Sequence, residues 1–243
     1  MQAVSVVFRR ELAEYVRSVL GYVVAAAVLI LAGLLFYSQG LGPAGGERLS
    51  GEVLARFFFF MSGLVAIAAI ALSIRLIAEE RQAGTLVLLS TSPVKEWEIV
   101  IGKFLSAFVF LAAITVASFY MPLLIMVNGK ISIGQVLVGY LGLLLIGSAC
   151  LAIGVFATSL TRHQLVAAVV GSALTGIMFL FWQLSQVLEP PLSRVFAGLA
   201  IHARHFIGFQ TGVLHLRDVV YYLAVTYFFL LLAIKAMEVK RWE

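Results

Sequence analysis

Six apolar stretches, each long enough to cross a membrane as a helix, dominate this sequence of 243 residues. A helix needs about 20 predominantly apolar residues to cross a hydrocarbon core of about 30 Å, where every backbone polar group must be bonded internally. Apolar residues make up 62% of the chain and charged residues 12%, which excludes a water-soluble fold. The sequence therefore predicts an all-α integral membrane protein with six transmembrane helices. The stretches cover residues 19–37, 53–78, 102–127, 135–160, 165–188 and 219–237.

Six spans place both termini on one side of the membrane, and the positive charges indicate which side that is. Eleven of the 17 lysines and arginines fall on the side of the termini, and six fall on the other. Cytoplasmic loops carry the excess of Lys and Arg in membrane proteins. We therefore expect both termini to be cytoplasmic and the protein to lie in the inner (plasma) membrane. The basic residues are scattered singly between apolar runs, so no nucleic-acid partner is predicted.

The chain is predicted to form one transmembrane domain, residues 1–243, that begins with an amphipathic segment, residues 1–18. Apolar side chains recur there at intervals of three or four residues, and charged side chains fall on another face. This pattern predicts an interfacial helix lying on the cytoplasmic leaflet; the alternative is a basic leader that only orients the first span. The apolar face contains Val4, Phe8, Leu12 and Tyr15, and the charged face contains Arg10, Glu14 and Arg17.

Residues 189–218 form a predicted extracytoplasmic helical segment between the last two spans. The sequence Glu189-Pro190-Pro191 ends the fifth span, and apolar residues then follow at helical spacing. We expect a short helix or hairpin that dips into the outer leaflet, and we expect Asp218 to cap the last span. The apolar residues are Leu192, Val195, Phe196, Leu199, Phe206 and Ile207.

The residues of an enzyme are not found at the spacing that catalysis needs. The only Gly-Lys in a suitable setting, Gly102-Lys103, is followed by Phe104, so it makes no phosphate-binding loop. Glu79-Glu80 has no nearby His for a metal site. Three histidines, His202, His205 and His215, could hold a metal, but we expect them to face solvent or lipid headgroups because no carboxylate or Cys accompanies them. No catalytic, cofactor or metal site is therefore predicted, and the single Cys150 is expected to pack in an apolar stretch.

A polar segment, residues 79–101, separates the second span from the third and is too patterned to be a simple linker. Gly84 can end the preceding helix, and Ser92 with Pro93 suits the start of the next one. Glu96 and Glu98 would then lie near the positive end of that helix. We expect this polar segment to project into the cytoplasm as a short amphipathic helix between two helix ends.

This polar segment resembles the cytoplasmic coupling segment of ABC-2 type transporter permeases, and we therefore call residues 79–101 the coupling segment. The resemblance is carried by Glu-Glu-Arg-Gln-Ala-Gly-Thr-Leu from Glu79, by Leu-Leu-Ser-Thr-Ser-Pro-Val from Leu88, and by Gly102-Lys103-Phe104. Residues 204–222 and 238–242 are similar to the gliding-motility-associated permease subgroup. The resemblance implies a permease that pairs with a second permease chain around a central path. It also implies a separate ABC ATPase subunit, which would bind ATP and Mg²⁺, since this chain has no phosphate-binding loop. The implied ATPase-docking surface contains Glu79, Glu80, Arg81, Gly84, Thr85, Leu86, Leu89, Pro93 and Lys95.

The function implied by this resemblance is ATP-driven transport, with export as the expected direction. Membrane lipids, a homologous or identical second permease chain and an extracytoplasmic accessory protein are the other expected partners. The alternative is a secondary carrier or channel that needs no ATPase, although no Asp, Glu or Lys lies near the middle of a predicted span to mark an ion path. An intramembrane enzyme or a structural membrane protein is a third hypothesis. The aromatic run at residues 57–60 suits an apolar cargo and equally suits rings that face lipid.

Overall fold

The computed structural model describes residues 2–38, 50–78, 95–128 and 131–240, and all the regular structure in these residues is helical. Six helical segments are long and apolar enough to cross a membrane, which confirms the predicted fold class. Their ends differ from the predicted ones by a few residues; α3 ends at Ser73 instead of residue 78, and the chain continues as a turn. The spans are α2 (Val19–Phe36), α3 (Ser50–Ser73), α6 (Glu96–Ala117) with α7 (Tyr120–Asn128), α8 (Ile133–Leu160), α9 (Gln164–Val187) and α12 (Leu216–Lys240).

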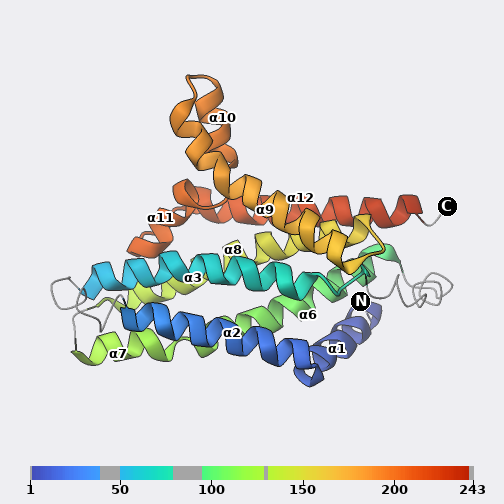
Figure 1. Cartoon of the computed structure of the whole chain (residues 1–243), viewed down its shortest axis with the longest axis horizontal. Coiled ribbons are helices and arrows are strands. Elements are labelled where there is room, and N and C mark those ends of the chain that lie inside the picture. Colours follow the sequence, from blue (N-terminus) through green and yellow to red (C-terminus); the bar gives the residue numbers. More distant parts are fainter. Residues whose placement is uncertain (1, 39–49, 79–94, 129–130, 241–243) are drawn as a thin grey trace.

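Helix α8 lies at the centre of the bundle, where it packs against α3, α6, α9 and α12 (Figure 1). Small residues on α8 allow these helices to approach closely. Close approach stabilises the bundle because van der Waals packing is a main force between helices in a membrane. A Cβ atom on Gly139 would overlap the ring of Phe58, and one on Gly154 would overlap the side chain of Ser73. The contact between α8 and α3 therefore depends on residues that have no side chain.

The third span is broken into α6 and α7 at Ser118 and Phe119. Pro122 causes the break: it lacks a backbone N–H, and its ring would clash with the carbonyl of Ser118 in a continuous helix. The Ser118 hydroxyl lies 3.0 Å from the hydroxyl of Tyr140 on α8, so the break is bonded to the central helix. The two pieces together still form one candidate span, Glu96–Val127.

The segment after α9 forms two short helices, α10 (Leu192–Leu199) and α11 (Ala203–Thr211). Short helices are therefore present where the sequence predicted a short helix or a hairpin, but they do not pair with each other: α10 packs against α9, and α11 packs against α8 and α3. The position of this segment in the outer leaflet remains a prediction. Helix α10 projects sideways from the bundle with the end of α9 (Figure 1), and the rings of Phe181 and Phe196 join them at 5.2 Å between centroids. Helix α12 begins at Leu216, so Asp218 lies in its first turn and the predicted cap position is wrong.

Helix α1 (Gln2–Arg17) precedes the first span. Ser18 follows it and caps α2, since its hydroxyl oxygen accepts a hydrogen bond from the Gly21 N–H at 3.0 Å. The helix is present as predicted, but its most buried face contains Val7, Glu11 and Tyr15. Of these, the sequence pattern identified only Tyr15. The buried face packs against α6, so α1 is bound to protein; its contact with a membrane surface remains a prediction.

We expect Gly154→Ala and Gly176→Ala to change stability in opposite directions. The new Cβ at position 154 forces Ser73 away from α8, and overpacking of this kind costs about 1–3 kcal/mol. Gly176, on α9, has no atom within 4 Å of such a Cβ, so alanine there should gain up to about 1 kcal/mol from helix propensity. Thermal unfolding of the two variants in the same detergent measures the difference. Equal melting temperatures would show that α3 and α8 are not in this close contact.

Candidate functional site

Most of the predicted ATPase-docking surface lies outside the described residues. Lys95 is described: it is exposed, and its backbone N–H donates to the Glu98 carboxylate at 3.1 Å. It has an extended backbone and occupies the N-cap position of α6, so the predicted start of this helix at Pro93 is wrong. The residues outside the described part are Glu79, Glu80, Arg81, Gly84, Thr85, Leu86, Leu89 and Pro93.

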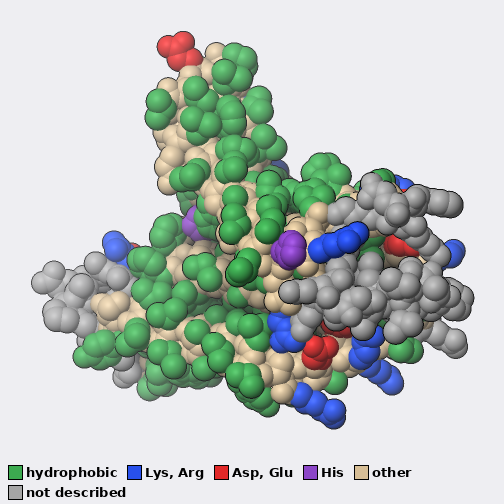
Figure 2. Space-filling model, turned by 45° about the vertical axis from the view of Figure 1, so that its right-hand side comes forward, with side chains coloured by type: hydrophobic (Ala, Val, Ile, Leu, Met, Phe, Trp, Pro, Cys, Tyr) green, Lys and Arg blue, Asp and Glu red, His purple; other side chains and the backbone are tan. Residues whose placement is uncertain are grey.

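The described residues on both sides of the coupling segment show where it joins the bundle. It leaves after Ala78, beyond the end of α3, and returns at Lys95, before the start of α6. Figure 1 shows these two points at the same end of the bundle as α1 and the C-terminal end of α12. Figure 2 shows most of the charged side chains of that face gathered there, while the neighbouring surface is largely apolar.

A buried ion pair connects α1 to α6 at this end. The Lys103 ammonium lies 2.9 Å from Glu11 Oε1, with 1% of Lys103 and 7% of Glu11 exposed. The guanidinium of Arg10 donates to the same oxygen at 2.7 Å. Removing a charge from water costs several kcal/mol, and only close partners with good geometry compensate for it. The pair therefore fixes one relative position of α1 and α6.

The charge state of Glu11 follows from the same neighbours. Burial disfavours the carboxylate, but the positive charges of Lys103 and Arg10 and their hydrogen bonds outweigh burial and hold the pKa of Glu11 below its ordinary value. Glu11 is accordingly ionised at neutral pH. Its contribution to stability is present above the ordinary pKa of Glu and is lost as the pH falls through the lowered value.

Helix α1 is also bonded to the end of α3. The Tyr15 hydroxyl donates to the backbone carbonyl of Leu72 at 2.7 Å, and Arg75 forms an ion pair with Glu14 at 3.1 Å. We call this set of contacts, with the pair of Glu11 and Lys103, the α1 junction. Because α3 ends and α6 begins beside the coupling segment, the α1 junction joins the two helices that flank it.

A second polar cluster attaches α11 and the residues before it to the last span. His205 Nδ1 lies 2.7 Å from Asp218 Oδ1, and both side chains are buried. The ring of Tyr221 stacks on His205 with 3.9 Å between centroids, and the Tyr222 hydroxyl donates to the carbonyl of Ile201 at 2.8 Å. The expectation that His205 faces solvent or headgroups is wrong, because this pairing across 13 residues buries it.

The histidines do not converge on a common centre. His215 is exposed, whereas His202 packs against Ser62 and Phe59 of α3, so the expectation that His202 faces solvent or headgroups is also wrong. Within the described ranges, no group of three or more His, Cys, Asp or Glu side chains could hold a metal ion. Cys150 is fully buried, as its apolar surroundings predicted.

We expect the variant Glu11→Leu to be less stable than the double variant Glu11→Leu/Lys103→Met. The single change removes a partner of the buried Lys103 ammonium and should cost about 3–5 kcal/mol, whereas an apolar replacement for both charges costs little. Thermal unfolding in detergent tests the order. The advantage of the native pair should also shrink as the pH falls below about 4.3, where Glu11 in the unfolded chain becomes protonated. A double variant that is no more stable than Glu11→Leu would contradict the pairing.

Comparison with known protein families gives one match. The family described as ABC-2 family transporter protein matches residues 5–233, from the first turns of α1 into the last turns of α12. The matched range includes the coupling segment, the α1 junction and helices α10 and α11. A search of curated proteins found no significant match. Because the match takes in all but the two ends of a chain with six candidate spans, the protein belongs to the ABC-2 transporter family, as a multi-pass membrane permease.

Proposed function

We propose that this chain is the permease subunit of an ABC exporter and that it couples ATP hydrolysis by a separate ATPase subunit to the movement of a substrate. The observation that carries the proposal is the family match over residues 5–233, which includes the coupling segment between α3 and α6. ATP and Mg²⁺ would be bound by the ATPase subunit, since no phosphate-binding loop occurs in this sequence.

The proposal includes an orientation, with both termini and the coupling segment in the cytoplasm. Both ends of the described chain lie at one end of the bundle (Figure 1), and Ala78 and Lys95 lie there too. Eleven of the 17 lysines and arginines belong to that side of the membrane, which favours a cytoplasmic position in the inner membrane. The opposite end, with helices α10 and α11, would face outwards and could receive an extracytoplasmic accessory protein.

The α1 junction suggests how force from an ATPase would reach the spans. A displacement of the coupling segment acts on the end of α3 and the start of α6, and α1 is bonded to both. These three helices should therefore move as one body, while differential ATPase contacts shift the population between two arrangements of the spans.

A second permease chain is part of the proposed assembly. Helix α8 fills the centre of the bundle, where 72% of the residues in its apolar stretch are buried, whereas only 17% of those in the apolar stretches of α9 and of α12 are buried. Their apolar side chains thus face lipid or another chain. A central path between two chains, related by two-fold symmetry, would fit this distribution. The similarity of residues 204–222 to gliding-motility permeases adds a candidate subgroup to the proposal.

We expect Glu80→Lys to reduce co-purification of the ATPase and transport-coupled hydrolysis while leaving membrane insertion near normal. The introduced lysine would repel basic groups of the ATPase at the interface, which lowers affinity. A charge change in a polar segment outside the spans alters folding stability by only about 0.5 kcal/mol or less, so insertion should be unaffected. Glu52→Lys is the matched control, since Glu52 is an exposed carboxylate at the opposite end of α3. Full ATPase binding and hydrolysis with Glu80→Lys would remove position 80 from the coupling surface.

We also expect two differently tagged copies of the chain, expressed together, to be captured by either tag alone. If a related chain is the native partner, that chain should be captured in place of the second copy. Extraction in mild detergent followed by mass measurement distinguishes the two assemblies. A monomer that retains ATP-driven transport with its ATPase would contradict the proposed pairing.

A further inference from the structure

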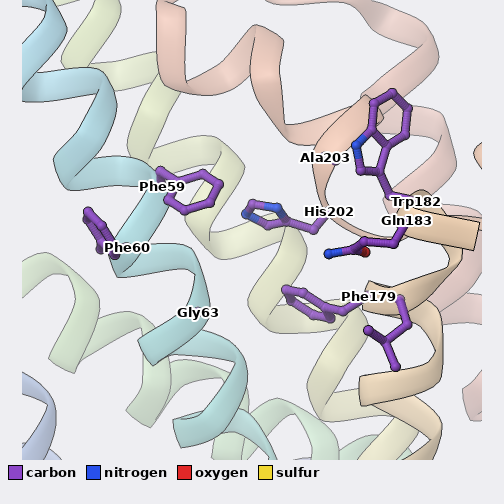
Figure 3. Close-up of a pocket in the computed structure, with 9 residues that line it drawn as sticks. Phe59, Phe60, Gly63, Phe179, Trp182, Gln183, His202 and Ala203 are labelled. Carbon is purple, nitrogen blue, oxygen red and sulfur yellow. The ribbon is translucent and has the colours of Figure 1, made fainter. Parts of the chain in front are cut away.

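A cavity of about 440 Å³ lies between α3, the second half of α9 and the residues that begin α11 (Figure 3). It is set along the spans and not beyond their ends: Phe59 follows Ser50, the first residue of α3, by about 14 Å of helix rise. Its volume falls in the range of about 300–1,000 Å³ that small-molecule sites occupy. The lining residues are Phe59, Phe60, Gly63, Phe179, Leu180, Trp182, Gln183, His202 and Ala203.

The chemistry of the lining is aromatic with a few hydrogen-bonding groups. None of the described lining residues carries a carboxylate, an ammonium or a guanidinium. Three of them, Trp182, Gln183 and His202, can form hydrogen bonds. Burial lowers the pKa of His202 to about 4, so its ring is neutral at physiological pH. A charged ligand would find no opposite charge here and would lose its hydration, which is costly in an apolar site.

The hydrogen bonds of His202 leave one of its nitrogens available as an acceptor. The Ser62 hydroxyl donates its single hydrogen to the carbonyl of Phe59 at 2.6 Å, and the same oxygen lies 2.7 Å from His202 Nε2. His202 Nε2–H is therefore the donor in this contact, and Nδ1 of the neutral ring carries a lone pair. Among the described residues, no further hydrogen bond reaches this ring.

The position of the ring is set by stacking. It lies nearly parallel to Phe179 and Phe206, at interplanar angles of 18° and 21°, and edge-on to Phe59. Figure 3 shows His202 between the aromatic side chains of α3 and those of α9. The His202 ring is thus held on an aromatic support in the wall of the cavity.

Gly63 keeps the cavity open from the side of α3. A Cβ atom built on Gly63 has no atom within 4 Å, unlike those on Gly139 and Gly154 of α8, which would overlap neighbouring side chains. Glycine in a helix interior costs about 0.5–1 kcal/mol relative to alanine. At Gly63 no close helix contact accounts for that cost, and the space beside it is the cavity itself.

We propose that this cavity binds a neutral amphipathic molecule with an apolar body and a hydroxyl or amide N–H that donates a hydrogen bond to His202 Nδ1. The aromatic walls would hold the apolar body, and Gln183 or the Trp182 indole could bond a second polar group. This site deepens the proposed function, on which it rests, by naming the chemical class of the molecule that the permease handles. Its test uses the chain without an ATPase, so a failure here is separate from a failure of coupling.

The test uses the fluorescence of Trp182 as the signal. Trp97→Phe and Trp242→Phe remove the other two tryptophans, and the chain is placed in phosphatidylcholine nanodiscs. The probes are 9,10-dibromostearyl alcohol and its methyl ether, which has the same apolar body and quenching bromines but no hydroxyl donor. We expect saturable quenching by the alcohol at a mole fraction about 2- to 10-fold lower than for the ether, the factor expected for one hydrogen bond.

Two variants with a matched control locate the site. Gly63→Leu should abolish saturable quenching because its side chain fills the cavity, whereas Gly176→Leu, on α9 but outside the lining, should not. His202→Phe keeps the stacked ring but removes Nδ1, so the alcohol should then bind no better than the ether. Quenching that rises in simple proportion to mole fraction, that is equal for the two probes in the native sequence, or that survives Gly63→Leu would overturn the proposal. The comparison of probes holds even if Gly63→Leu fails to fold.

Discussion

The hydrocarbon interior of a membrane offers no hydrogen bond to a peptide group, and the rest of this structure depends on that constraint. It forces the apolar stretches into helices whose backbone bonds are internal. It also leaves packing, more than the exclusion of water, to hold these helices together. The glycines of α8 answer this need, since they allow α3 to approach the central helix until a single added methyl group would overlap its side chains. Hydroxyl groups in the spans follow the same rule: those of Ser73 and Thr115 donate to carbonyls of their own helices.

Among the described residues, the buried charged side chains and the buried His205 lie in two places, one at each end of the bundle. The α1 junction holds a short helix against the starts and ends of spans at one end, through charges that would be unfavourable without each other. At the other end, the pair of His205 and Asp218 holds α11 against α12. In both places, a helix that does not cross the membrane is attached to helices that do. The polar clusters therefore determine how the ends of the bundle are assembled, while apolar packing determines its middle.

The sequence predicted the features that depend on local hydropathy and missed those that depend on distant partners. The sequence predicted the ends of each span to within a few residues, because each span is one continuous apolar stretch. The break before Pro122 had a local signal that could have been used. The buried face of α1 could not be predicted in the same way: Glu11 is charged, and its burial depends on Lys103, which lies 92 residues later. His202 and Ser62 are 140 residues apart, and the cavity beside them exists partly because Gly63 has no side chain. The predicted docking surface, apart from Lys95, lies outside the part of the chain that the structure describes.

The interruption between α6 and α7 gives the third span two rigid pieces with separate attachments. Helix α6 is bonded to α1 through the ion pair of Lys103 and Glu11, and the break itself is bonded to α8 through Ser118 and Tyr140. Because the helix is interrupted at Ser118 and Phe119, α6 can change its tilt without moving α7. A displacement of the α6 end that is bonded to α1 would thus rotate α6 about Ser118, with α7 remaining in place at the opposite end of the bundle.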